Sequence, residues 1–229
     1  MERRDVQHSI YRSWEMVDLM DLGETFSNGA PLGVNEEFRD LVLADESGYL
    51  RVYLAGINLS HYNFLLTDYS YFQFSWSSLD RVRYAFYPNP FEGSAADFKR
   101  RRELVESGLI TQDEYLSLLH DARLDPRTPL LRYEHAPEQY KELHHPCSHF
   151  HIGHHADNRW ALNRLLTPLA FTLLILKLYY GSVWRDLGLD DTDECGNSFE
   201  TKLIEEKANC RLISDALFST VEARSFFFA

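Results

Sequence analysis

Three strand-like segments follow one another so closely that only one kind of sheet accommodates them. Residues 61–67, 71–76 and 81–87 are rich in aromatic and β-branched residues and are separated by short polar turns. Parallel strands need a crossover of about a dozen or more residues, so each of these connections is a hairpin. Pro88 and Pro90 end the series, because proline cannot donate a hydrogen bond to a neighbouring strand. The segment predicts an antiparallel meander.

Four further segments have the composition of strands. Residues 38–44 form an apolar run, and residues 49–55 alternate between apolar and polar side chains after a turn-forming stretch. Later in the chain, residues 130–134 and 145–151 also predict strands. Added to the meander, these segments give an antiparallel sheet of about six or seven strands.

Helical periodicity occurs on either side of these strands. Residues 6–22 and 199–223 both carry apolar residues at helical spacing. Between the two groups of strands, residues 94–122 predict a helical hairpin, whose second helix begins with a capping box formed by Thr111 and Glu114. The chain therefore alternates between a sheet-forming part and helices that can cover it.

The most apolar segment lies at about residues 167–185. It begins with Thr167 and Pro168, which are typical of the start of a helix in a soluble protein. Lys177 lies near its middle, and the residues that follow are acidic rather than basic. We therefore predict a buried core helix here and no membrane span, although the length of the segment approaches that of a bilayer.

The order of these elements predicts one α+β domain over residues 1–229, with an antiparallel sheet covered by helices on one side. A chain of 229 residues is long enough to bury a substantial core. In this arrangement, the helical hairpin at about 94–122 is an insertion. Residues 186–224 form an acidic C-terminal helical segment.

The charge of the chain is acidic and unevenly distributed. Its formal net charge is −12, which argues against nonspecific binding of nucleic acid through a basic surface. Residues 186–206 contain eight acidic residues and one lysine, whereas residues 99–164 contain ten acidic and ten basic ones. Three cysteines, with no secretion signal at the N-terminus, suit a reducing, cytoplasmic location.

Histidines are concentrated in one part of the chain. Seven of the ten lie between residues 131 and 164. If His149 and His151 lie on a strand, its period of two places both imidazoles on one face. By the same rule Arg132 and Glu134 share a face of their own strand, so two adjacent strands can bring all four side chains together.

Such a cluster has the groups that cleavage of an RNA phosphodiester requires. We expect His149 and His151 to act as acid and base, with Arg132 and Arg159 binding phosphate and Glu134 orienting an imidazole. These five residues are the candidate catalytic residues. The candidate substrate-binding residues lie nearby in the sequence: His144, His145, Tyr133 and Arg164.

Other interpretations of the same residues remain open. A His-x-His pair on a strand with a carboxylate nearby is also a common arrangement for a divalent metal, so a metal at His149 and His151 is the alternative to a site without cofactor. Cys147 is a weaker candidate nucleophile, because it follows a proline and no helix N-terminus precedes it.

The histidine segment resembles a known group of toxins. Residues 132–137 (RYEHAP), 144–146 (HHP) and 149–151 (HFH) are similar to the R-Y-D-N-A-P…H-H-x-H region of TumE-type bacterial toxins, which are regarded as ribonucleases. The wider pattern, with Asn158-Arg159-Trp160 and Leu166-Thr167-Pro168, resembles an uncharacterised bacterial domain family. The departures are a glutamate in place of aspartate at position 134, a longer chain and an acidic charge.

The resemblance implies a toxin or antiphage effector with endoribonuclease-like activity, and RNA as its substrate. Two alternatives belong to different classes. One is a non-catalytic subunit of a defence or toxin complex, in which the acidic residues 186–206 bind a protein partner such as an antitoxin. The other is a metal-dependent hydrolase.

Overall fold

The computed structural model describes most of the chain, namely residues 1–44, 48–78, 81–91, 103–105, 107–111, 114, 129–154, 158–188 and 198–226. Most of the helical hairpin predicted at 94–122 lies outside these residues, as does the centre of the acidic stretch at 189–197. The capping box that was predicted to start the second helix of the hairpin is present. The Glu114 carboxylate accepts a hydrogen bond from the backbone N–H of Thr111 at 2.8 Å, and the Thr111 hydroxyl accepts one from the N–H of Glu114 at 3.2 Å.

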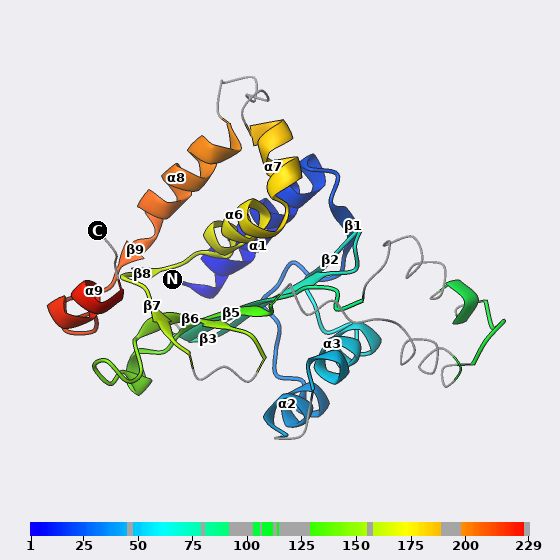
Figure 1. Ribbon diagram of the computed structural model, residues 1–229, viewed down its shortest axis with the longest axis horizontal. Coiled ribbons are helices and arrows are strands. Elements are labelled where there is room, and N and C mark those ends of the chain that lie inside the picture. The colour runs from blue at the N-terminus through cyan, green and yellow to red at the C-terminus, as the bar shows by residue number, and fades with distance from the viewer. Residues whose placement is uncertain are drawn as a thin grey trace.

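A seven-stranded antiparallel sheet forms the centre of the molecule, in which each strand pairs with the next one along the chain (Figure 1). This confirms the predicted α+β class and the predicted sheet of six or seven strands. The meander of three strands is β2 to β4, and the two later strands are β5 and β6. The strands are β1 (Gly23–Phe26), β2 (Phe64–Leu66), β3 (Tyr71–Ser78), β4 (Arg81–Tyr87), β5 (Leu131–His135), β6 (Ser148–Ile152) and β7 (Trp160–Ala161).

Helices cover both faces of this sheet, not one as predicted. Figure 1 shows one group of helices above the sheet, made of α1 (Arg3–Leu19), α6 (Pro168–Tyr179), α7 (Gly181–Gly188) and α8 (Phe199–Asn209). Below it lie α2 (Glu36–Leu43) and α3 (Tyr49–Asn58). A short helix, η1 (Pro137–Gln139), follows β5, and the chain ends with a small sheet of β8 (Arg164–Leu165) and β9 (Arg211–Leu212) and with α9 (Thr220–Phe226).

The strands predicted at 38–44 and 49–55 are wrong, because these segments form α2 and α3. Asn35 begins α2, and its side chain accepts a hydrogen bond from the backbone N–H of Phe38 at 3.0 Å, as an N-cap does. In α3 the buried residues are Val52, Tyr53, Gly56 and Ile57, a spacing that places them on one side of a helix. The aromatic and β-branched composition indicated strands, but burial against the sheet follows the helical period.

Strand alternation divides the core into two layers. On β4, Val82, Tyr84 and Phe86 belong to the apolar cluster under α1 and α6. The intervening Ala85 and Tyr87 belong to the second cluster, which packs under α2 and α3. Side chains alternate between the two faces along a strand. The polar residues at the same alternate positions as Ala85 and Tyr87 therefore lie on the face of the second cluster.

The predicted apolar core helix at 167–185 is present, but it is divided into α6 and α7. Thr167 caps α6 by accepting a hydrogen bond from the N–H of Ala170 at 3.0 Å, and Pro168 is its first residue, as predicted. Lys177 is exposed and forms an ion pair with Glu200 of α8. Among the residues described, no helix is both long enough and apolar enough to cross a membrane.

The single helix predicted over 199–223 is also wrong. Helix α8 ends at Asn209, and Cys210 adopts an extended backbone conformation. The next residues form β9, in which Arg211 and Leu212 pair with β8. The helical spacing of apolar residues was therefore a coincidence beyond Cys210, where Leu212 is 60% exposed.

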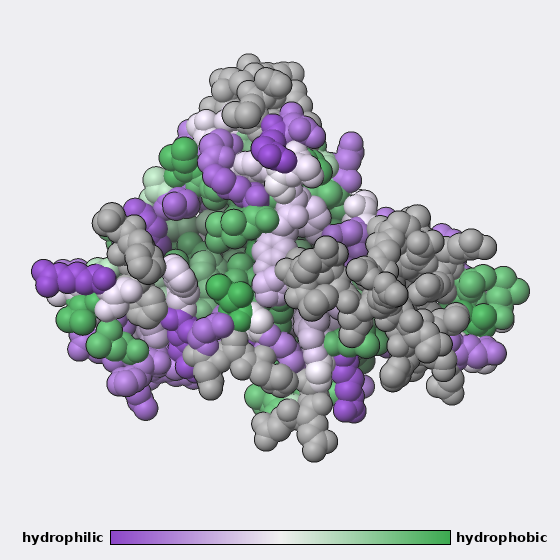
Figure 2. Space-filling view, in the orientation of Figure 1, coloured by the Kyte–Doolittle hydropathy of each residue, from purple (hydrophilic) through white to green (hydrophobic). Residues whose placement is uncertain are grey.

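The exposed surface offers little indication of a site. Figure 2 shows the hydrophobic residues of one face in several groups with hydrophilic residues between them. Exposed large apolar side chains come from many elements, as Leu19 of α1, Leu43 of α2 and Ile204 of α8 illustrate. Scattered residues of this kind are ordinary on a protein surface, so the polar residues of the sheet are the better guide to function.

The close contact between α3 and the sheet gives a testable prediction for Gly56. A Cβ atom added there would lie 2.0 Å from the Tyr71 hydroxyl oxygen, and Tyr71 is fully buried and stacked on Tyr87. Alanine would gain about 1 kcal/mol of helix propensity, but overpacking costs about 1–3 kcal/mol. We expect Gly56→Ala to lower the free energy of unfolding, measured by urea denaturation.

Gly181 provides the control, because a Cβ atom added there meets nothing within 4 Å. We expect Gly181→Ala to leave the free energy of unfolding unchanged or slightly raised. A Gly56→Ala protein that is as stable as the wild type would show that α3 does not approach β3 this closely.

Candidate functional site

The register of three strands places the predicted site residues in two rows across the sheet. In the first row, Arg83 of β4 lies opposite Glu134 of β5, which lies opposite His149 of β6. In the second row, Arg132 of β5 lies opposite His151 of β6. All of these positions share the face that carries α2 and α3, because they alternate with the residues of the first core cluster.

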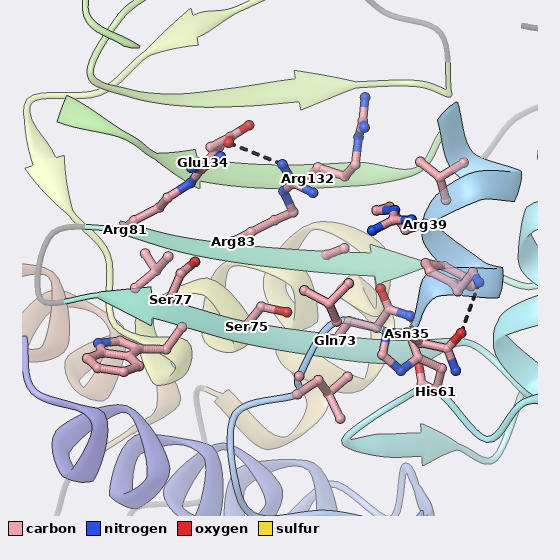
Figure 3. Close-up of a pocket in the computed structure, with 18 of the residues that line it drawn as sticks. Asn35, Arg39, His61, Gln73, Ser75, Ser77, Arg81, Arg83, Arg132 and Glu134 are labelled. Carbon is pink, nitrogen blue, oxygen red and sulfur yellow. Dashed lines mark hydrogen bonds and ion pairs between the residues drawn. The ribbon is translucent and has the colours of Figure 1, made fainter. Parts of the chain in front are cut away.

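A pocket of about 540 Å³ opens over this face, between α2 and the strands β3 to β5 (Figure 3). Its floor is polar and its α2 wall is largely apolar. The lining residues on which the following argument depends are Phe38, Arg39, Val42, Gln73, Ser75, Arg81, Arg83, Tyr87, Arg132 and Glu134. The volume falls within the range of about 300–1,000 Å³ that is usual for small-molecule sites.

The charge of the pocket is opposite to that of the chain. Four of the lining residues are arginines, and Glu134 is the one carboxylate that lines the pocket among the residues described. Arg83 pairs with Glu134 at 3.3 Å (Figure 3), and Arg81 and Arg39 pair with carboxylates outside the lining. In a chain of net charge −12, this cationic pocket is a position that favours anion binding.

Arg132 differs from the other arginines of the pocket. Its side chain is partly buried, and burial lowers the pKa of its guanidinium. Within the described part of the chain, no carboxylate forms an ion pair with it, and its buried Nε has no hydrogen-bond partner. Its Nη2 donates a long hydrogen bond of 3.4 Å to the carbonyl oxygen of His154. A partly buried guanidinium in this state has hydrogen-bonding capacity for an anion.

The two imidazoles of β6 lie side by side, as the alternation predicts. The Nδ1 of His149 lies 2.7 Å from the carbonyl oxygen of Pro146 and therefore donates a hydrogen bond to it. When His149 is neutral, its Nε2 then carries a lone pair, and this Nε2 lies 3.0 Å from the Nε2 of His151. Both residues are buried, with exposures of 0% and 9%.

The electrostatic surroundings keep His149 neutral. Burial, followed by the neighbouring His151, lowers the pKa of His149 to about 4. A neutral imidazole at pH 7 accepts a proton or binds a cation, but it does not serve as a general acid. For Glu134, burial acts to raise the pKa, but the charge and hydrogen bond of Arg83 and the two imidazoles outweigh it and lower the pKa.

Glu134, His149 and His151 are close enough to act on one ion or one substrate atom. One donor atom from each, a carboxylate oxygen or an imidazole nitrogen, lies within 4.8 Å of the others. Glu134 also lines the pocket, so it connects the imidazole pair to the cationic floor. The structure thus brings together four of the five residues predicted to be catalytic.

The fifth, Arg159, immediately precedes β7. This strand pairs with β6 through Trp160 opposite Phe150 and Ala161 opposite His149. Continuing the same register by one residue places Arg159 beside His151, on the same face of the sheet.

The residues predicted to bind substrate are distributed differently. The ring of His145 lies 4.9 Å from that of His149, so it adjoins the site, whereas His144 is exposed in the preceding turn. Arg164 donates hydrogen bonds to the carbonyl oxygens of Cys210 and Ala208 at 2.8 and 3.3 Å. These contacts tie β8 to the end of α8, so the structure does not bring Arg164 to the pocket.

Tyr133 lies on the opposite face of β5, in the first core cluster, and is fully buried. Its hydroxyl accepts a hydrogen bond from the N–H of Leu166 at 3.0 Å and donates one to the Ser148 hydroxyl at 2.7 Å. Ser148 in turn donates to the carbonyl oxygen of Arg164 at 2.8 Å. Tyr133 therefore joins β5, β6 and β8 within the core and does not reach the pocket.

The residues that the sheet and α2 add to the site could not be identified from the sequence. The alternation of residues 81–87 places Arg81 and Arg83 on one face, but their alignment with Arg132 and Glu134 depends on a register that the sequence does not specify. Arg39 was missed because α2 was interpreted as a strand. Because the register of β4 was unknown and α2 was interpreted as a strand, the pocket could not be predicted.

Comparison with known proteins places the chain in a family. The chain belongs to the conserved, uncharacterised protein family DUF2290. The match covers residues 27–214. It therefore includes all the residues that line the pocket and both histidines of the imidazole pair. This confirms the expected uncharacterised family, whereas nothing in the comparison supports a similarity to TumE-type toxins. No curated protein and no solved structure matches the chain.

Tyr133 provides a test of the hydrogen-bonded core of this DUF2290 protein. Removing its hydroxyl leaves the N–H of Leu166 and the oxygen of Ser148 without this partner, at a cost of about 1–3 kcal/mol. We expect Tyr133→Phe to lower the free energy of unfolding by this amount in urea denaturation. Tyr11→Phe, at a 45% exposed position, is the control and should have little effect. Unchanged stability of Tyr133→Phe would contradict the structural role.

Proposed function

We propose that this protein cleaves phosphodiester bonds, with RNA as its substrate class. The observation that supports the proposal is the position of Arg132. Its guanidinium has no carboxylate counter-ion among the described residues, and it lies on the pocket floor beside Glu134 and opposite His151. An anion bound there is next to groups that accept a proton or bind a cation.

Arginine is suited to hold a phosphate of this kind. Its planar guanidinium donates two parallel hydrogen bonds to phosphate oxygens, and it opposes the negative charge that grows on them in the transition state. Arg83 lies in the neighbouring row and adds positive charge on the other side of Glu134. The phosphate is therefore held where the two rows of side chains meet the imidazole pair.

The remainder of the pocket fits the other parts of a nucleotide. Gln73 and Ser75 of β3 supply hydrogen-bonding groups, and Phe38 and Val42 of α2 supply an apolar wall. A nucleotide combines a charged phosphate with a planar base that has both polar edges and an apolar face. The acidic exterior and the cationic pocket together favour binding of a few nucleotides in the pocket over binding along the surface.

Cleavage of RNA in this pocket is a transesterification that needs no further reactant. The 2′-oxygen of the ribose forms a bond to phosphorus, while the bond between phosphorus and the 5′-oxygen breaks. One proton leaves the 2′-hydroxyl and one joins the 5′-oxygen. Directly, Glu134 or neutral His149 would act as the base and His151 as the acid. Alternatively, the three groups would hold a metal that would activate the 2′-hydroxyl.

A role as a toxin or antiphage effector follows from this activity only if cleavage harms the host or an invading phage. That role is carried over from the sequence pattern of the histidine segment. The alternative of a non-catalytic subunit relies on the acidic residues 186–206, and no contact of the described residues favours it.

Substitution of Arg132 tests the proposal. We expect purified protein to cleave a labelled single-stranded RNA in the presence of Mg²⁺ or Mn²⁺. Arg132→Met removes the charge but keeps much of the side-chain volume. Because a hydrogen bond to a charged group is worth about 1.5–3 kcal/mol, and 1.4 kcal/mol is tenfold, this variant should cleave about 10–100 times more slowly.

Arg51→Met is the matched control. Arg51 is an exposed residue of α3 and does not line the pocket, so the same change of charge should leave the cleavage rate as in the wild type. Equal rates for Arg132→Met and the wild type would refute the assignment of Arg132. Absence of RNA cleavage by the wild type, with or without metal, would refute the proposed function.

A further inference from the structure

We propose that Glu134, His149 and His151 bind one divalent transition-metal ion. This inference deepens the proposed function, because it assigns the imidazole pair to a metal rather than to direct acid and base catalysis. It is nevertheless testable without any substrate.

The distance between the two imidazole nitrogens matches two ligands of one ion. The Nε2 atoms of His149 and His151 are 3.0 Å apart. An ion at a usual metal–nitrogen distance of about 2.05 Å from each would have a nitrogen–metal–nitrogen angle of about 95°. This is near the right angle of adjacent ligands in six-coordinate sites.

The backbone fixes His149 in the tautomer that metal binding requires. Its Nδ1–H donates to the carbonyl oxygen of Pro146 at 2.7 Å, which leaves a lone pair on Nε2, the nitrogen that lies near His151. Metal-bound histidines usually make such a hydrogen bond with their other ring nitrogen, because it orients the ring and raises its basicity. Pro146 lies in the turn before β6, so the same turn that starts the strand sets the ring.

Glu134 completes a set of two histidines and one carboxylate. One of its carboxylate oxygens lies within 4.8 Å of one ring nitrogen of each imidazole, and two ligands of one ion are at most about 4.2 Å apart. A small rotation of the side chain therefore brings it into the coordination sphere. Arg83, which holds this carboxylate at 3.3 Å, then acts as an outer partner that keeps it ionised and oriented.

A shared proton is the alternative to a metal between these two nitrogens. Without a metal, the pair is satisfied when His151 donates its Nε2–H to the Nε2 of His149. That arrangement uses one buried hydrogen bond between the imidazoles. It does not explain why the Glu134 carboxylate lies beside them and also lines a cationic pocket. A metal ion uses all three groups at once and leaves coordination positions for phosphate oxygens on the pocket side.

The donor set indicates the class of metal. Two imidazoles and a carboxylate suit Mn²⁺, Fe²⁺, Co²⁺, Ni²⁺ or Zn²⁺, whereas Mg²⁺ and Ca²⁺ prefer oxygen ligands only. An angle near 90° favours ions that accept six ligands over a closed tetrahedral zinc site. When bound, such an ion would polarise the phosphate and lower the pKa of a bound hydroxyl.

Metal binding is measured on the full chain after treatment with EDTA and its removal. The protein is titrated with MnCl₂ and, separately, with ZnCl₂ by isothermal titration calorimetry, and free Mn²⁺ is followed by electron paramagnetic resonance. We expect one ion to bind per chain. His151→Ala and Glu134→Gln each remove one ligand and should weaken binding by at least about 100-fold, the upper end of the loss for an outer-shell partner.

His8→Ala is the matched control, because His8 is an exposed residue of α1 outside the cluster, and it should bind metal as the wild type does. Circular dichroism checks that the variants fold. Glu134→Gln keeps the size of its side chain, so it tests the site even if His151→Ala fails to fold. No binding of either ion by the wild type, or equal binding by folded Glu134→Gln, would overturn the inference.

Failure of this inference is distinguishable from failure of the proposed function. No metal binding by the wild type, together with undiminished RNA cleavage in EDTA, would overturn the metal site and leave the proposed function intact. One bound Mn²⁺ ion that is lost in Glu134→Gln, without RNA cleavage by the wild type, would support the metal site and overturn the proposed function.

Discussion

The register between β4, β5 and β6 is the constraint on which the site depends. It sets Arg83, Glu134 and His149 in one row and Arg132 and His151 in the next. A shift of one residue in any of these strands would turn its polar side chains into the apolar core. The core prevents this, because Tyr84, Tyr133 and Phe150 alternate with the site residues and are buried on the other face.

The fold also explains why a polar row can exist on a sheet that is covered on both faces. On one face, α1 and α6 pack directly against aromatic and aliphatic side chains of the strands. On the other, α2 and α3 pack against Tyr71, Ala85 and Tyr87, and a pocket remains beside α2. The arginines lie in this uncovered part. The site therefore lies on the part of this face that α2 and α3 leave uncovered.

The charge of the pocket is opposite to the net charge of the chain. The chain as a whole repels polyanions, but the pocket floor carries Arg81, Arg83 and Arg132. Glu134 neutralises Arg83 and lies within reach of the two imidazoles. Arg132 keeps no such partner among the described residues. One side chain thus remains available to an anionic ligand in the middle of an otherwise paired network.

The sequence was sufficient to predict five of the seven strands, β2 to β6, and the proximity of Arg132, Glu134, His149 and His151, whereas β1 and β7 were not predicted. The short intervals between strands required antiparallel hairpins, and the His-x-His and Arg-x-Glu spacings each placed their side chains on one face. These inferences use local periodicity, which the sheet preserves.

The helices α2 and α3 could not be predicted in this way. Their aromatic and β-branched residues favour strands, and tertiary packing overrode this preference. The assignment of Tyr133 to substrate had a different cause: it overlooked the alternation that places Arg132 and Glu134 on one face and turns Tyr133 to the other. Arg39, Arg81 and Arg83 were missed because only the fold shows which segments lie beside β5.

The most direct test of this account is a crystal structure of the protein grown with MnCl₂, with an anomalous difference map calculated at a wavelength sensitive to manganese. We predict one strong peak about 2.0–2.3 Å from the Nε2 atoms of His149 and His151, with the Glu134 carboxylate as third ligand. A map without a peak at this position, or imidazoles directed to opposite faces of β6, would contradict it.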